Sequence, residues 1–290
     1  IKAMKELGFN MIRKHIKVEP SRWYMHCDRE GILVWQDLPS PNLPEGHEAF
    51  ARQNFEEEAV RIIDAFENHP SIVQWVVFNE GWGQFDTERM TQVVIDKVSP
   101  QSLVCCASGW NDAEIGDIKD SHSYPYPSCP IDQKRACVNG EYGGITLKVP
   151  GHIWPGGDFG YTTVETPEDF TVMFNDLADK IKDHYYYGLN AAVYTQLSDV
   201  EIEKNGIYTY DRRILKPYSP TGELKDKILE CINMPQSDVK IQPVVSTAKE
   251  HKYKWKFITE DNAPRHWFAK GFDDSLWPKG TAAFGKSSLW

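Results

Sequence analysis

The chain has 290 residues, of which 41% are apolar, enough for one large domain or two smaller ones. Its 42 acidic residues outnumber its 32 basic ones, and the net charge of −10 argues against nucleic acid or an anionic membrane as a partner. The longest apolar run, around residues 72–78, is far shorter than the roughly 18 residues that a membrane span requires.

Seven strand-like runs follow one another along the first 200 residues, with helical patterns between several of them. They cover residues 9–15, 32–38, 71–80, 102–108, 118–124, 135–141 and 190–197. Several are apolar throughout instead of alternating, which is typical of strands that are buried on both faces of a parallel sheet.

The segments between these runs predict amphipathic helices. Ser21 is expected to cap one helix, which Gly31 ends. Apolar residues at helical spacing over 55–66 predict a second. Thr166 is expected to cap a third, over residues 167–181, because a proline occupies its first turn.

Strands that alternate with helices predict an α/β fold with a parallel sheet. An eighth strand ahead of Ile1 would complete a barrel, so we expect a (β/α)8 TIM barrel that lacks its first strand, over residues 1–232. The alternative is an open doubly wound sheet, but its usual G-x-G-x-x-G turn does not occur.

The pattern changes near residue 232. Residues 233–249 are polar, contain two prolines and predict a linker. Residues 250–290 combine short strand candidates, turns and many aromatic side chains, and predict the beginning of an all-β domain.

Polar or aromatic side chains occupy the C-terminal ends of six strand runs. They are Asp37, Asn79 and Glu80, Ser108 and Trp110, His122 and Tyr124, Glu141, and Gln196 and Asp199. In a barrel, these ends meet at the face where active sites form.

Glu80 and Glu141 suggest one particular chemistry. Glycoside hydrolysis uses two carboxyl groups, one protonated to assist the leaving oxygen and one ionised. If Glu80 is the acid, its pKa should be raised before the reaction begins. The alternative is that each glutamate neutralises a cation such as Arg13 at the rim of the barrel. The two glutamates together favour catalysis.

Six stretches carry a family resemblance: "GFNMIRKH", "WYMHCDREGILVWQDLPS", "HPSIVQWVVFNEGWGQ", "DSHSYPYP", "VNGEYGG" and "NGIYTYDRRILKP". Through them, residues 1–217 resemble the catalytic domain of glycoside hydrolase family 2, which contains β-galactosidases, β-glucuronidases and β-mannosidases. The resemblance implies a (β/α)8 barrel, a mechanism that retains anomeric configuration, and N-terminal β-domains that precede this segment. Residues 272–285 resemble the opening of a galactose-binding-like β-sandwich.

The resemblance also implies roles for individual residues. Glu80 matches the general acid/base and Glu141 the nucleophile. Asn79 matches a residue that binds the sugar 2-hydroxyl, and Arg13 an arginine near the nucleophile. The remaining candidates for substrate binding are His122 and Tyr124, from the same resemblance, and Asp37, Trp110 and Gln196, from their strand-end positions.

Two departures from the family pattern bear on the substrate. His15 follows Arg13 by two positions, whereas β-galactosidases carry Arg-x-x-His. Glu203, Lys204 and Asn205 stand where β-glucuronidases carry Asn-x-Lys, and the acidic Glu203 disfavours a uronate substrate.

The predicted function is a retaining exo-β-glycosidase of the β-galactosidase-like kind, acting on carbohydrate. The alternatives are a carbohydrate-binding protein without activity and a transglycosylase that uses the same two glutamates. No cofactor and no metal are predicted, because the histidines and the six cysteines lack metal-ligand spacing. The compartment stays open, with a periplasmic or secreted location favoured over the cytoplasm.

Overall fold

The structure, a computed structural model, describes residues 1–40, 42, 48–235, 254–256, 264 and 272–281. The chain divides into two compact units, Ile1–Val239 and Lys240–Trp290, which are described separately. Within the described ranges, no helix has the length and apolar character needed to cross a membrane.

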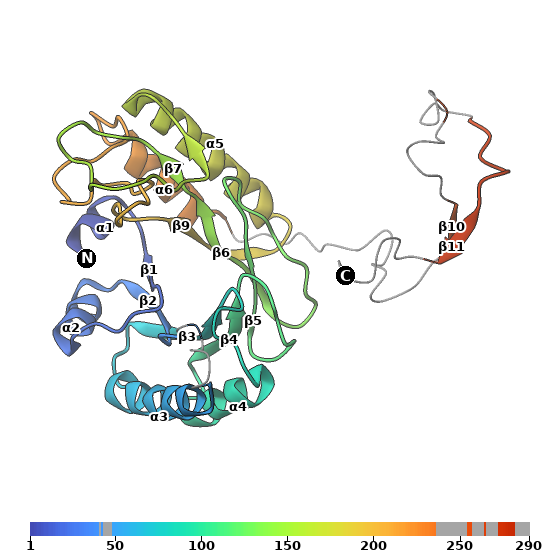
Figure 1. Cartoon of the computed structure of the whole chain (residues 1–290). Coiled ribbons are helices and arrows are strands. Elements are labelled where there is room, and N and C mark those ends of the chain that lie inside the picture. The colour runs from blue at the N-terminus through green and yellow to red at the C-terminus, as the bar shows by residue number, and fades with distance from the viewer. Residues whose placement is uncertain (41, 43–47, 236–253, 257–263, 265–271, 282–290) are drawn as a thin grey trace. The chain divides into compact units, whose positions relative to one another are not determined.

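Seven parallel strands form the centre of the first unit (Figure 1). One sheet has the order β1 (Met11–Lys14), β2 (Leu33–Asp37), β3 (Ile72–Asn79) and β4 (Leu103–Ser108). The other has the order β5 (Ile118–His122), β6 (Ala136–Gly143) and β9 (Leu189–Thr195). The Asp117 amide donates to the Val104 carbonyl at 2.8 Å and so joins the start of β5 to β4. All seven predicted strands are present, and the strand expected ahead of Ile1 stays a prediction.

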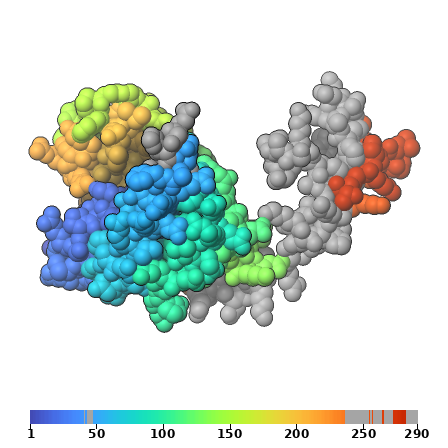
Figure 2. Space-filling model, turned by 60° about the horizontal axis from the view of Figure 1, so that its bottom comes forward, coloured from blue at the N-terminus to red at the C-terminus, as the bar shows by residue number. Residues whose placement is uncertain are grey.

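Helices lie on the outside of these strands (Figure 1). They are α1 (Lys2–Glu6), α2 (Ser21–Glu30), α3 (Glu48–Phe66), α4 (Thr87–Lys97), α5 (Pro167–Tyr185) and α6 (Glu223–Ile232). In Figure 2 the surface of α3 and α4, in light blue to teal, faces the viewer. On α3, the side chains of Phe55, Ala59 and Ile63 are buried toward the strands, as the spacing predicts.

Two of the three predicted helix ends are confirmed. The Thr166 side chain accepts a hydrogen bond from the Asp169 amide, and Gly31 ends α2 in the left-handed conformation, at φ 63°. The prediction for Ser21 is wrong. Pro20 has the extended backbone of an N-cap and its carbonyl accepts from Trp23, so Ser21 is already the first helical residue.

An apolar layer lies between the strands and supports the polar ends. Its buried side chains come from five neighbouring strands: Trp35, Val76, Cys105, Ile118 and Val138. Each of these apolar residues comes before the polar residue at the end of its strand. The polar residues therefore pack against a buried apolar layer. Such a layer restricts the positions that the polar side chains can adopt.

Two further pairs of strands are short. In the segment between β6 and α5, β7 (Ile145–Thr146) pairs in parallel with β8 (Thr162–Thr163). In the second unit, β10 (Lys254–Lys256) pairs antiparallel with β11 (Lys279–Thr281). Most of the predicted linker at 233–249 and of the predicted β-domain at 250–290 lies outside the described residues, so both stay predictions.

Candidate active site

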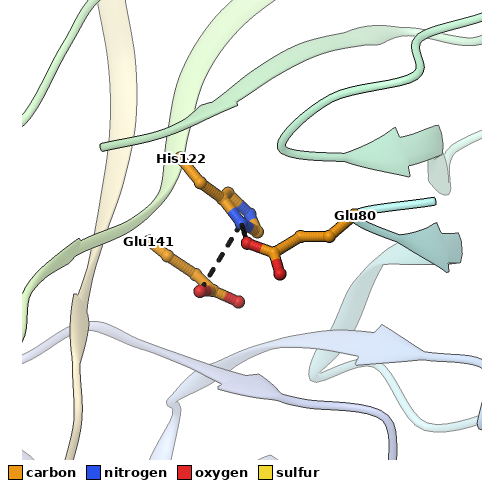
Figure 3. Close-up of side chains that lie close together, drawn as sticks. All are labelled: Glu80, His122 and Glu141. Carbon is orange, nitrogen blue, oxygen red and sulfur yellow. Dashed lines mark hydrogen bonds and ion pairs between the residues drawn. The ribbon is translucent and has the colours of Figure 1, made fainter. Parts of the chain in front are cut away.

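Glu80 and Glu141 lie together at the C-terminal ends of the strands, with His122 beside both (Figure 3). Glu80 follows β3, Glu141 lies within β6 and His122 ends β5. The Nδ1 atom of His122 is 2.6 Å from Oε1 of Glu80 and 3.5 Å from Oε2 of Glu141. One oxygen of each glutamate and one ring nitrogen of His122 all lie within 4.8 Å of one another. The two carboxyl groups therefore face each other across a distance that a sugar ring atom can bridge.

Arg13 joins three other predicted site residues, Asp37, Asn79 and Glu141. Its Nε and Nη2 atoms donate to the two carboxylate oxygens of Asp37 at 3.1 and 2.8 Å. Its Nη2 also donates to Oδ1 of Asn79 at 2.8 Å, and its Nη1 donates to Oε1 of Glu141 at 3.1 Å. A planar guanidinium with five donors suits such a fork. The sequence also left open that Glu141 neutralises Arg13, and the structure contains this ion pair.

The charges of this group hold one another in place. The side chains of Arg13 and Asp37 are 2% and 1% exposed. Burial on its own would lower the pKa of Arg13, but the charges of Asp37 and Glu141 raise it. Burial on its own would raise the pKa of Asp37, but Arg13 and His15 lower it.

Arg13→Met is expected to reduce the free energy of unfolding by about 3–5 kcal/mol, because the buried Asp37 loses its partner. The difference in the free energy of unfolding between this variant and the wild type should become smaller as the pH falls. The native pKa of Asp37 is lowered, so its contribution exists above its unfolded pKa and is lost as the carboxylate is protonated. Guanidinium denaturation at several pH values measures both effects.

Arg89→Met is the matched control, because Arg89 pairs with Glu56 at exposures of 51% and 36%. It should change the free energy of unfolding by less than about 1 kcal/mol. Equal losses in the two variants would contradict the burial argument.

Tyr124 engages the second oxygen of Glu141. Its hydroxyl donates to Oε2 of Glu141 at 2.6 Å and lies 3.0 Å from Oγ1 of Thr195. Burial and the Glu141 charge both raise the pKa of Tyr124, so the phenol stays a donor. The ring of Tyr161 stacks on that of Tyr124 with centroids 3.6 Å apart. Both oxygens of Glu141 are thus held by donors.

Glu80 differs from the sequence-based expectation in one respect. Burial raises the pKa of its carboxyl group, but the hydrogen bond and charge of His122 lower it to below the ordinary value. The expectation of a raised pKa considered burial alone. The contact of 2.6 Å with His122 reverses the sign in the substrate-free protein.

Two further predicted residues have different surroundings. Trp110 is half-exposed and places its ring edge-on to His122, with centroids 6.0 Å apart. The Gln196 amide donates to Oε2 of Glu203 at 3.2 Å and to Oδ1 of Asn205 at 2.8 Å. Within the described part of the chain, its hydrogen bonds do not reach Glu80 or Glu141.

Three residues contribute to the site without having been predicted to do so. Ser108 is predicted only to lie at a strand end, and Asp120 is predicted only to lie inside the strand run at residues 118–124. Asp120 precedes His122 by two positions, and this period-two spacing places both on one face of β5. Tyr161 reaches Tyr124 from the loop before β8, and no pattern in the sequence indicates such a contact.

Glu80, His122 and Glu141 also have the donor types of a divalent-cation site. However, Arg13 and Tyr124 already donate to the two oxygens of Glu141. A guanidinium 3.1 Å from Oε1 opposes the binding of a second cation there. The arrangement therefore favours two carboxyl groups that act side by side over a metal centre.

Comparison with known proteins supplies the family. The family model described as "Glycosyl hydrolases family 2, TIM barrel domain" matches residues 1–230. A β-glucuronidase of Bacteroides fragilis is 31% identical over 87 residues, which cover 28% of this chain and 12% of that protein. A mannosylglycoprotein endo-β-mannosidase of Lilium longiflorum is 25% identical over 282 residues, covering 79% of this chain and 26% of that protein. The chain thus spans about a quarter or less of the length of these relatives.

A solved structure supports the fold. The crystal structure of a family 2 β-galacturonidase from Eisenbergiella tayi matches with a TM-score of 0.60 at 17% identity, covering 78% of this chain and 46% of that one. At this identity the likeness concerns the fold alone. With the family match over 230 of 290 residues, the chain belongs to glycosyl hydrolase family 2 and contains its TIM barrel domain.

Proposed function

We propose that the chain is the catalytic domain of a retaining, exo-acting β-glycosidase, with Glu141 as nucleophile and Glu80 as general acid/base. The observation that carries this proposal is the approach of the two carboxyl groups to within 4.8 Å. Retaining enzymes place their carboxyl groups about 5–5.5 Å apart, whereas inverting enzymes need about 6.5–9.5 Å to admit a water molecule.

The surroundings of each glutamate fit its proposed role. In the first step, Glu141 attacks the anomeric carbon while Glu80 gives a proton to the departing oxygen. Arg13 and Tyr124 aim the Glu141 carboxylate and restrict its rotation. In the second step, Glu80 takes a proton from water, which attacks the anomeric carbon and releases Glu141. Asn79, fixed by Arg13, is left to bind a sugar hydroxyl beside Glu80.

Exposed aromatic rings near the glutamates support carbohydrate as the ligand. Trp82, two residues after Glu80, is 55% exposed, and Trp110 beside His122 is 50% exposed. Flat rings of this kind stack on the apolar faces of sugars.

The charge of the site favours a neutral sugar over a uronate. Burial and the charges of Glu141, Glu203 and Glu80 raise the pKa of Tyr161 to about 12. Glu203 is held beside the end of β9, where its Oε2 atom accepts from the side-chain amide of Gln196 at 3.2 Å. Lys204 does not compensate, because its ammonium group binds Asp158 and the Gly157 carbonyl.

The test is a panel of aryl β-glycosides on the complete protein. Neutral glucosides, galactosides and mannosides are expected to include a substrate whose kcat/KM exceeds that of the glucuronide by at least about 100-fold, given that a like-charge contact opposes binding by several kcal/mol. Glu203→Gln should reduce the ratio of kcat/KM for the neutral glycoside to kcat/KM for the glucuronide. Saturable binding of sugars without hydrolysis would instead support a carbohydrate-binding protein. Glycoside products of higher mass than the substrate would support a transglycosylase.

A further inference from the structure

A chain of three side chains runs behind Glu80. Asp120 is fully buried, and its Oδ2 atom accepts a hydrogen bond from the Ser108 hydroxyl at 2.5 Å. The Ser108 oxygen in turn lies 2.8 Å from Nε2 of His122. A hydroxyl group has one proton. Since Ser108 gives that proton to Asp120, its oxygen faces His122 as an acceptor.

This geometry assigns the proton of His122. If Ser108 accepts, Nε2 of His122 is the donor and carries a hydrogen atom. Nη1 of Arg13 lies 3.3 Å from Nε2, but its two hydrogen atoms have nearer acceptors in Oε1 of Glu141 at 3.1 Å and the Gly140 carbonyl at 3.2 Å. The other nitrogen, Nδ1, faces Oε1 of Glu80 at 2.6 Å. A contact this short between a ring nitrogen and a carboxyl oxygen requires one proton between them. That proton resides either on Nδ1 or on Oε1.

We propose that Asp120 and Ser108 are positioning residues that fix the Nε2–H form of His122, so that His122 and Glu80 share one proton and act together as the acid/base. This inference rests on the proposed function of Glu80. Two groups coupled this closely titrate as a pair, and the pH dependence of the reaction belongs to the pair.

The proton balance of the reaction is consistent with this arrangement. When the bond from Glu141 to the anomeric carbon forms and the glycosidic bond breaks, the shared proton leaves with the aglycone oxygen. When water attacks, its proton returns to the pair and the bond to Glu141 breaks. The pair therefore begins and ends the cycle with one proton, and no other reactant is required.

Asp120 also contacts the backbone next to the other glutamate, Glu141. Its Oδ1 atom accepts from the amide of Gly140 at 2.6 Å, and Gly140 directly precedes Glu141. A Cβ atom at position 140 would lie 2.2 Å from Oδ2 of Asp120, so only glycine permits this approach. One buried carboxylate thus positions the backbone beside the nucleophile and the ring beside the acid.

The charges around His122 give the direction of the expected pH effect. Glu80, just after β3, Glu141 in β6 and Asp120 in β5 have carboxylate oxygens near the ring, and Nη1 of Arg13 in β1 lies 3.3 Å from Nε2. The carboxylates of Glu141 and Asp120 stabilise the protonated pair of Glu80 and His122, and Arg13 opposes it. Removal of the Asp120 charge, or of the Ser108 acceptor, therefore lowers the proton affinity of the pair.

The experiment compares pH profiles of kcat/KM for Ser108→Ala and Asp120→Asn with the wild type, on the complete protein. The basic limb, where the acid loses its proton, is expected to move to lower pH by about one unit. Ser71→Ala, a buried serine at the opposite end of β3, should leave the limb in place. Lower activity at every pH with an unmoved limb would overturn the inference.

A second measurement needs no variant. In nitrogen NMR of the wild type with labelled histidine, His122 is expected to carry a proton on Nε2 both above and below the basic limb. A bare Nε2 would overturn the inference even if a variant failed to fold. Inactivity of the wild type toward every glycoside would refute the proposed function instead, so the two failures are distinguishable.

Discussion

Glu141→Gln is expected to reduce the hydrolysis of aryl β-glycosides by at least about 10⁴-fold, because in the proposed mechanism it removes the covalent nucleophile and with it the reaction path. Glutamine has nearly the same size and keeps an oxygen that accepts from Arg13 or Tyr124. Its neutral amide cannot attack the anomeric carbon. The loss should be equally large for good and for poor leaving groups, since both depend on the same attack.

Steady-state kinetics with a series of aryl glycosides provides the measurement, and circular dichroism verifies that the variant is folded. Glu58→Gln is the matched control, because Glu58 is an exposed residue of α3 and its replacement should leave kcat/KM unchanged. If Glu141→Gln retained more than about a tenth of the activity, Glu141 would not be the nucleophile.

The strands were predictable from the sequence because burial on both faces imposes continuous apolar runs. β3 is the clearest example, since nearly all of its side chains are buried and the run is interrupted only by Gln74. The cap of α2 was not predictable in the same way. Proline and serine are both acceptable at a helix start, and the backbone conformation of Pro20 decides where the helix begins.

The strand-end rule located most of the candidate site, because parallel strands direct their C-terminal ends to one face. For Gln196 the role in substrate binding stays a prediction, since its side chain donates to Glu203 and Asn205 in the loop after β9. The strand-end rule cannot give the sign of a pKa shift. For Glu80 that sign depends on His122, which is 42 positions away in the sequence and 2.6 Å away in space.

Asp120 illustrates a different limit. A charged residue inside a strand interrupts the apolar pattern, and Asp120 lies in the middle of the run at residues 118–124. In the structure the side chain of Asp120 is fully buried, and donors from Ser108 and Gly140 satisfy both of its oxygens. A residue that weakens a pattern and is nonetheless buried is a candidate for function.

Glu80→Gln is expected to have an effect that depends on the leaving group. For an alkyl or phenyl glycoside, whose departing oxygen needs a proton, kcat/KM should fall by about 10²–10⁴-fold, the usual contribution of general acid catalysis. For a dinitrophenyl glycoside, which departs as a stable anion, kcat/KM should fall much less. The reason is that kcat/KM reports the first chemical step, in which Glu80 acts only as the acid.

The turnover number of the dinitrophenyl substrate should nevertheless decrease, because in the proposed mechanism Glu80 also acts as the base that deprotonates water in the second step. A burst of dinitrophenol ahead of slow turnover would then reveal accumulated glycosyl-enzyme. Equal losses of kcat/KM for both leaving groups would remove Glu80 from the acid role. The contrast with Glu141→Gln is informative, because a substitution that merely disturbed the Arg13, His122 and Tyr124 network would reduce both substrates alike in either variant.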